Sequence, residues 1–256
     1  MSRIENLFVT KKSGILNVYC TAGFPQLNST LEVMKALQDR GADLIELGMP
    51  YSDPLADGPV IQASSAKALQ NGMTISKLFE QLKGFRKKIH IPVILMGYLN
   101  PLLQYGFEKF CATAAENGID GLIIPDIPVY EYENEYKEIV DKYNLDFIFL
   151  VTPETSEERI RRIDELSTGF LYAVSSSSIT GSEKDFSAVE NYLDRLKKMN
   201  LKNPFLVGFG IKNKSTFKSA CKYANGAIIG SAYIETIKNT NNIAEATGSF
   251  LNEILN

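Results

Sequence analysis

Residues 43–59 read "DLIELGMPYSDPLADGP", an apolar run that leads through Glu46 into a stiff loop. The loop, residues 49–59, holds three prolines, and its glycine and aspartates are typical of tight turns. The run before it is short and nearly continuous, as expected for a parallel strand that is covered on both faces. The stretch therefore predicts a buried strand with a carboxylate near its end and a rigid loop behind it.

The same unit recurs along the chain. Seven further apolar runs predict strands: "ILNVYCT" (15–21), "PVILMGY" (92–98), "DGLIIPD" (120–126), "DFIFLVT" (146–152), "GFLYAVS" (169–175), "PFLVGFG" (204–210) and "GAIIGS" (226–231). Helical patterns cover residues 29–41, 130–143 and 156–167, and a short helix is expected before the first strand.

Eight strand–helix units in 256 residues predict one α/β domain, residues 1–256, folded as a (β/α)8 or TIM barrel. The alternative is an open, doubly wound parallel sheet. No "GxGxxG" follows the first strand, which counts against that alternative.

The composition excludes several classes of protein. The net charge of −3 does not favour nucleic acid or anionic membranes as partners. No apolar run approaches the roughly 20 residues of a membrane span, and we expect a cytoplasmic protein. Cys20, Cys111 and Cys221 are too few and too far apart for a disulfide framework or a zinc site, so each is expected to be a small buried apolar residue.

In such a barrel the active site lies at the carboxyl ends of the strands. The residues at these ends exclude several kinds of catalysis. The single histidine, His90, precedes the third strand at the opposite end. The carboxylates at the strand ends show no metal-ligand spacing, and Lys212 is the one lysine near such an end. No nucleophile elbow is present. Acid–base catalysis by carboxylates remains, without a metal or cofactor.

Glu46 is the strongest candidate for that chemistry. Its neighbours Leu44, Ile45 and Leu47 are apolar, so its carboxyl group is expected to face a dry pocket. Burial of this kind raises a carboxyl pKa toward neutrality, which suits a group that both donates and accepts a proton. The alternative is a Glu that only caps backbone groups. Asp57, on the following loop, either faces the same substrate or is an ordinary turn residue.

Glycines after the last two strands suggest an anion site. "VGFGIK" and "IIGSA" place Gly208, Gly210, Gly230 and Ser231 where barrels commonly bind phosphate. Backbone N–H groups at a helix start can donate to a dianion, and no Lys or Arg stands directly beside Gly230 and Ser231. The alternative is that these are simple turn glycines.

Seven motifs follow one another along the whole chain: "TAGFP", "ELGMPYSDPLADGPVIQASSAKAL", "YLNPLLQYG", "GLIIPDIP", "SITG", "VGFGI" and "GAIIGSA". With them the chain resembles the α subunit of tryptophan synthase. The resemblance implies a lyase of tryptophan biosynthesis that cleaves indole-3-glycerol phosphate to indole and glyceraldehyde 3-phosphate. It implies that Glu46 is the general acid and base, and that Asp57 stabilises positive charge on the indole nitrogen.

The resemblance also assigns the remaining site residues. It implies substrate contacts from Tyr98, Tyr172, Thr180 and Phe209, with Thr180 helping to hold Asp57, and phosphate contacts from Gly181, Gly210, Gly230 and Ser231. In the loop "SSSSITGS" (175–182), Ser178 stands where the family usually carries Gly and Ser176 where it often carries Arg. Because of these two differences, the resemblance does not predict how this loop closes over the substrate.

Finally, the resemblance implies an α2β2 heterotetramer in which indole passes to a β subunit that carries pyridoxal phosphate. Asp53, Pro54 and Pro128 are then expected at the interface with that partner. Three alternatives stay open at this point: a stand-alone lyase, another phosphate-binding barrel such as an isomerase or a different aldolase, and a degenerate subunit that only binds and activates the β subunit.

Overall fold

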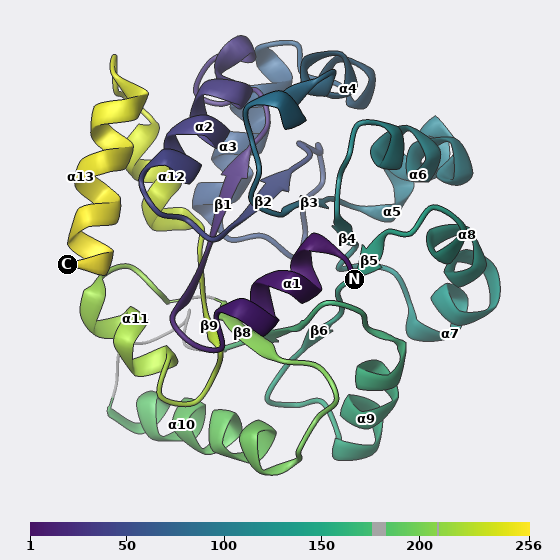
Figure 1. The fold of residues 1–256 in the computed structure, drawn as a ribbon, viewed down its shortest axis with the longest axis vertical. Coiled ribbons are helices and arrows are strands. Elements are labelled where there is room, and N and C mark those ends of the chain that lie inside the picture. The colour runs from purple at the N-terminus through teal and green to yellow at the C-terminus, as the bar shows by residue number, and fades with distance from the viewer. Residues whose placement is uncertain (176–182, 209) are drawn as a thin grey trace.

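A computed structural model describes residues 1–175, 183–208 and 210–256, which build a ring of strands surrounded by helices (Figure 1). The strands of these residues are all parallel and belong to one sheet, in the order β5-β4-β3-β2-β1-β9-β8-β7-β6. Their bounds are β1 Ile15–Thr21, β2 Leu44–Gly48, β3 Val93–Met96, β4 Gly121–Ile123, β5 Asp146–Phe147, β6 Leu150–Val151, β7 Leu171–Val174, β8 Phe205–Gly208 and β9 Gly226–Ile229.

The sheet closes on itself at residues 146–151. β5 pairs with β4, and β6 pairs with β7. Between the two halves the Ile148 N–H group donates to the Leu122 carbonyl at 3.0 Å, and the Tyr172 N–H group donates to the Phe149 carbonyl at 2.9 Å. Residues 146–151 therefore pair with β4 on one side and with β7 on the other, and together they occupy one strand position of the barrel. The predicted eight-stranded barrel is confirmed, with its fifth strand found in two short pieces, and the open-sheet alternative is wrong.

Apart from α1, which lies over one end of the barrel, the helices surround the strands (Figure 1). Their bounds are α1 Arg3–Thr10, α2 Thr30–Asp39, α3 Pro59–Gln70, α4 Ile75–Leu82, α5 Leu99–Tyr105, α6 Phe107–Glu116, α7 Val129–Glu131, α8 Lys137–Lys142, α9 Glu157–Leu166, α10 Glu183–Lys198, α11 Lys214–Ala220, α12 Ser231–Ile237 and α13 Ile243–Leu255. Short 3-10 turns occupy Leu27–Ser29 and Phe85–Lys87. The predicted helices at 29–41 and 156–167 are confirmed as α2 and α9, and the one before the first strand as α1.

The segment 130–143 was expected as one helix but is not uniform. α7 and α8 are separated by a π-helical turn, Tyr132–Tyr136. Within this turn the Tyr132 ring is buried against Phe147 and Phe149, with ring centroids 4.0 and 5.0 Å apart. The sequence pattern does not distinguish such a turn from a regular helix.

The interior of the barrel is apolar at its amino-terminal end. Each strand position contributes to a buried cluster of Ile15, Leu44, Ile94, Ile123, Ile148, Phe170, Leu206 and Ile228. α1 lies across this end (Figure 1), with Ile4 fully buried and Phe8 5.7 Å from Phe170 between ring centroids. Because α1 plugs one end, a ligand can reach the interior only from the carboxyl end of the strands.

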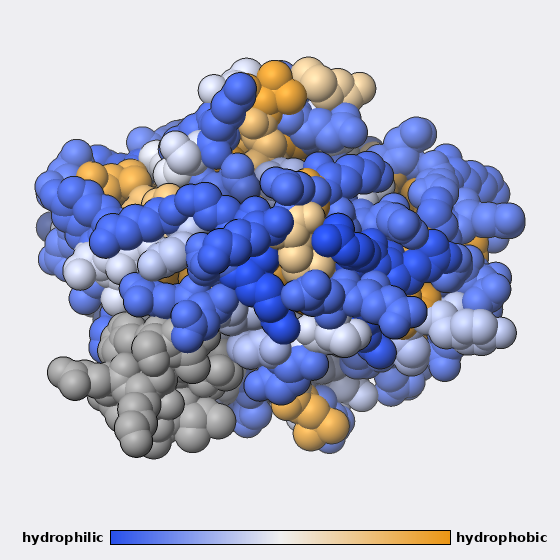
Figure 2. Space-filling model, turned by 90° about the horizontal axis from the view of Figure 1, so that it is seen from below, coloured by the Kyte–Doolittle hydropathy of each residue, from blue (hydrophilic) through white to orange (hydrophobic). Residues whose placement is uncertain are grey.

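The outer surface over α9 and α10 is mainly hydrophilic, with hydrophobic residues in small separate groups (Figure 2). In the three described ranges, no helix is long and apolar enough to cross a membrane. Cys20 and Cys111 are buried, as predicted, whereas Cys221 is partly exposed because it lies at the end of α11.

Asp120 ties the plugged end of the barrel together. Its carboxylate, which is almost fully buried before β4, accepts hydrogen bonds from Arg86 and, at 2.9 Å, from Arg3 of α1. It also accepts the Val93 N–H group of β3 at 2.7 Å. One side chain thus joins α1, β3 and β4, and its charge is compensated by two guanidinium groups.

We expect Asp120→Ala to lower the free energy of unfolding by about 3–5 kcal/mol, because it leaves Arg86 without its buried partner. Urea denaturation followed by circular dichroism measures the change. The control is Asp141→Ala, which removes an exposed pair with Lys137 and should cost less than about 1 kcal/mol. Equal losses in the two variants would contradict the role given to Asp120.

Candidate functional site

A cavity of about 630 Å³ opens at the carboxyl end of the barrel. Strands β1, β2, β3, β7 and β9 contribute to it, together with the loops that follow β2, β8 and β9. The residues that the following paragraphs use are Tyr19, Glu46, Asp57, Pro59, Tyr172, Gly210, Lys212, Gly230 and Ser231. The predicted acid pair and part of the predicted phosphate site therefore share one cavity, although they lie far apart in the sequence.

Glu46 is the third residue of β2 and is only 1% exposed. Its Oε2 atom accepts a hydrogen bond from the Asn17 amide at 3.0 Å, so its partner is a side chain rather than a backbone cap. Burial raises the pKa of Glu46 to about 8, the Asn17 bond lowers it in part, and the nearby charge of Asp57 raises it. A carboxyl group with this pKa can donate a proton and take one back near neutral pH.

Asp57 is held by the stiff loop between β2 and α3. The Tyr98 hydroxyl donates to its Oδ2 atom at 3.0 Å and accepts the Ala56 N–H group at the same distance. The Asp57 N–H group donates to the Pro54 carbonyl, and Pro59 begins α3 just beyond. Burial raises the pKa of Asp57, and the Tyr98 bond opposes that rise. The prolines of the loop thus fix the direction in which this carboxyl group points.

Tyr98, which the resemblance predicts as a substrate contact, is hydrogen bonded to Asp57. It is 6% exposed, and the described part of the cavity wall does not include it. The Tyr51 ring packs against it with centroids 5.3 Å apart. Tyr98 therefore helps to hold Asp57 in place, and its contact with substrate stays a prediction.

Two tyrosines occupy space that glycines leave free. Tyr172 of β7 lies over Gly208, where a Cβ atom would collide with its ring, and Tyr19 of β1 lies over Gly48 in the same way. Burial raises the pKa of both hydroxyls well above the ordinary value. Sequence reasoning found Tyr172 but missed Tyr19. Gly208, expected near phosphate, instead makes room for Tyr172.

Three residues that were predicted to bind phosphate, Gly210, Gly230 and Ser231, also line this cavity. Gly210 has a φ of +74°, a conformation that favours glycine, and Gly230 precedes α12, whose first hydrogen bond runs from the Ile234 N–H group to the Gly230 carbonyl. The sequence shows no cation next to Gly230 or Ser231, but the fold brings one to this cavity. Lys212 is exposed and is the only Lys or Arg in the described cavity wall.

The other predicted residues are placed as follows. Thr180, Gly181 and Phe209 lie outside the described residues, as do Ser176 and Ser178. Asp53 and Pro128 are exposed and Pro54 is partly exposed, on the loops after β2 and β4. His90 is exposed before β3. In the described chain, no group of three or more His, Cys, Asp or Glu side chains could hold a metal ion.

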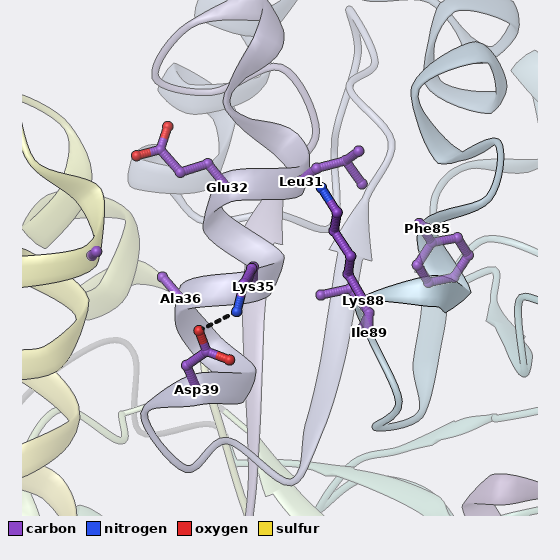
Figure 3. A pocket seen from close by; sticks show the side chains of 9 residues that line it. Leu31, Glu32, Lys35, Ala36, Asp39, Phe85, Lys88 and Ile89 are labelled. Carbon is purple, nitrogen blue, oxygen red and sulfur yellow. Dashed lines mark hydrogen bonds and ion pairs between the residues drawn. The ribbon is translucent and has the colours of Figure 1, made fainter.

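A second cavity, of about 330 Å³, lies on the outside of α2 (Figure 3). Apolar side chains such as Leu31, Phe85 and Ile89 line it, and its charged residues are all exposed. Figure 3 shows that two of these, Lys35 and Asp39, pair with each other along the helix. Without a buried titratable group, this cavity offers no acid–base chemistry, and the barrel cavity is the candidate active site.

Comparison with known proteins agrees with this geometry. The model of the family "Tryptophan synthase alpha chain" matches residues 6–253. The chain is 54% identical to the tryptophan synthase alpha chain of Parabacteroides distasonis, over 98% of each chain. Its fold is similar to the tryptophan synthase subunit alpha of Legionella pneumophila, with a TM-score of 0.90 and 34% identity over 99% of this chain and 97% of that one. Its fold is also similar to a chain of the tryptophan synthase complex from Pyrococcus furiosus, with a TM-score of 0.86 and 36% identity over 95% of this chain and 98% of that one.

From the raised pKa of Glu46 we predict how the free energy of unfolding depends on pH. The unfolded Glu ionises near pH 4.5 and the folded one near 8, so between these values only the folded chain keeps the proton. The free energy of unfolding therefore falls as the pH rises through this window. Glu46→Gln removes the effect and should be more stable than the wild type by about 2–4 kcal/mol at pH 9, with little difference near pH 5.

Urea denaturation at the two pH values measures this difference. Glu253→Gln, an exposed Glu near the end of α13, is the control and should change neither value. The same advantage of Glu46→Gln at pH 5 and pH 9 would show that Glu46 is not held protonated by burial.

Proposed function

This chain belongs to the tryptophan synthase alpha chain family, and from that premise we propose how its residues act and what it assembles with. It is a lyase that cleaves indole-3-glycerol phosphate in tryptophan biosynthesis. The family needs no cofactor on this chain, and pyridoxal phosphate belongs to the β subunit.

We propose that Glu46 carries out both proton transfers of the retro-aldol cleavage. Protonated Glu46 donates to C3 of the indole ring, which makes the ring an electron acceptor. The resulting carboxylate then takes the proton of the hydroxyl next to the scissile C–C bond. That bond breaks, its electron pair returns to the ring, and indole and glyceraldehyde 3-phosphate result. The observation that supports this role is a buried carboxyl group in the cavity with a pKa of about 8.

Asp57 is proposed to stabilise the positive charge that develops on the indole nitrogen. This interaction strengthens toward the transition state, because the nitrogen becomes cationic only after C3 is protonated. The Tyr98 hydroxyl and the proline-rich loop hold the carboxylate in a fixed direction, which avoids reorganisation during the reaction. Tyr98 and Tyr172, with Thr180 and Phe209 outside the described residues, are proposed to contact the substrate.

The phosphate group is proposed to bind the backbone near Gly210, Gly230 and Ser231, with Gly181 from outside the described residues. All three of the described residues line the same cavity as Glu46. Lys212 adds a positive charge to this cavity. With the phosphate at the glycines, the indole ring is proposed to lie near Glu46 and Asp57, which line the same cavity.

The chain is proposed to work in an α2β2 heterotetramer and to pass indole to the β subunit. The similar structures include a chain of a tryptophan synthase complex. Asp53, Pro54 and Pro128 lie in the segments that follow β2 and β4 at the carboxyl end of the barrel, and their neighbours Leu55 and Tyr130 are 92% and 77% exposed. We propose that the partner covers these two apolar side chains. We further propose that residues 1–256 act as one catalytic domain in the cytoplasm.

Glu46→Gln tests the catalytic proposal. The amide cannot transfer a proton, so kcat for indole release should fall by about 10²–10⁴-fold or more, while binding of glycerol phosphate stays nearly unchanged. A colorimetric indole assay with the purified chain and the β subunit measures the rate. Glu253→Gln, the control, should keep wild-type activity. Unchanged turnover in Glu46→Gln would remove Glu46 from the mechanism, and an inactive wild type would favour the degenerate-subunit alternative.

Leu55→Asp tests the proposed interface. A charge at the centre of an apolar contact should weaken binding of the purified tryptophan synthase β subunit by about tenfold or more. The matched control is Val9→Asp, an exposed apolar residue of α1 at the plugged end of the barrel. Isothermal titration calorimetry compares the two variants. Equal affinities would place the interface elsewhere, and full indole release by the chain alone, without binding, would favour the stand-alone lyase.

A further inference from the structure

A buried amide stands inside the barrel, where the surrounding positions are apolar. Asn17 of β1 is 0% exposed and lies on the same strand face as Ile15, a member of the interior cluster. Its register partners are Leu44 on β2 and Ile228 on β9, which belong to the same cluster. A buried amide is costly unless its polar atoms are hydrogen bonded, so a reason is needed for Asn rather than an aliphatic residue at this position.

Only one of the two polar atoms of the Asn17 amide has a hydrogen-bond partner among the described residues. The Asn17 Nδ2 atom donates to Oε2 of Glu46 at 3.0 Å. The Oδ1 atom is buried, and it has no hydrogen-bond partner among the described residues. Packing alone does not explain such an arrangement, because an aliphatic side chain of similar size would leave no unpaired oxygen. The feature that only the amide provides is the N–H donor to Glu46.

The hydrogen bond from Asn17 makes the two carboxyl oxygens of Glu46 different. Oε2 is engaged by Asn17, whereas Oε1 has no hydrogen bond from any described residue, and Glu46 lines the cavity. A carboxyl group fixed at one oxygen cannot rotate freely, so the other oxygen keeps a constant direction. An acid that must reach a ring carbon gains from this restriction, because proton transfer requires a short and well-aligned approach.

We propose that Asn17 is a positioning residue for the cleavage reaction: its amide fixes Oε2 of Glu46 so that Oε1 is the oxygen that gives and takes the proton. The proposal rests on the acid–base role proposed above for Glu46. Asn17 touches neither substrate nor reacting atoms and acts only through Glu46. The same bond stabilises the carboxylate form, which Glu46 must reach in every cycle after it has donated its proton.

Asn17→Leu tests this proposal. Leu has the same number and branching of side-chain heavy atoms as Asn, and it removes the donor together with the unpaired oxygen, so the variant should unfold at the same urea concentration as the wild type or at a higher one. Its kcat should fall by about tenfold or more, because Glu46 is no longer held in place. KM should stay within about twofold, because the contacts to phosphate and indole are intact.

The pH profile separates positioning from packing. Without a donor to its charged form, Glu46 should have a higher pKa, so the alkaline limb of kcat should move to higher pH in Asn17→Leu. The control is Asn203→Leu, which removes a second buried Asn that donates to a buried carboxylate, Asp164, at 2.9 Å and lies outside the cavity. That variant should lose stability and keep the wild-type pH profile.

The proposal would be overturned if Asn17→Leu had the same kcat as the wild type and if its kcat fell at the same alkaline pH. Asn17→Ala provides a second variant with less bulk. If neither variant folds, the proposal also fails, since it assigns the amide to catalysis and not to folding. An inactive wild type, or an active Glu46→Gln variant, would instead overturn the proposed function itself, which keeps the two failures distinguishable.

Discussion

The burial of one carboxyl group, that of Glu46, is the constraint on which the site depends. Water hardly reaches its side chain, and this burial keeps the proton on the group up to about pH 8. The barrel provides the dry surroundings, because its interior cluster fills the amino-terminal end and α1 closes it. The same burial disfavours the folded state whenever Glu46 is charged, so catalysis is supported at the expense of stability.

The rest of the site follows from the need to hold other groups around this carboxyl group. Asp57 is on a loop, and a loop alone would not fix its direction. The Tyr98 hydroxyl supplies that restraint. Tyr19 and Tyr172 narrow the cavity, and each needs a glycine opposite it, Gly48 and Gly208 respectively. Substituting either glycine would therefore displace a cavity wall, although neither has chemistry of its own.

The sequence predicted the barrel well, because parallel strands that are covered on both faces leave continuous apolar runs; β1 matches its predicted bounds, Ile15–Thr21. Glu46 and Asp57 were identifiable because a charged residue in a buried apolar run and another in the stiff loop behind it are conspicuous, although Glu46 lies in the middle of β2 rather than at its end. Asn17 and Tyr19 were missed, since inward and outward residues of a fully buried strand look alike in sequence. Proximity across strands was equally hidden, so Lys212 was not linked to Gly230 and Ser231, and the hydrogen bond from Tyr98 to Asp57 was not foreseen.

The central claim is that burial keeps Glu46 protonated at neutral pH in the folded chain. The most direct test is a titration of the Glu46 carboxyl carbon, followed by 13C nuclear magnetic resonance in chain labelled at glutamate and assigned with Glu46→Gln. The account predicts a midpoint near pH 8 for Glu46. A midpoint for Glu46 close to the ordinary value of 4.5 would contradict the claim and the mechanism built on it.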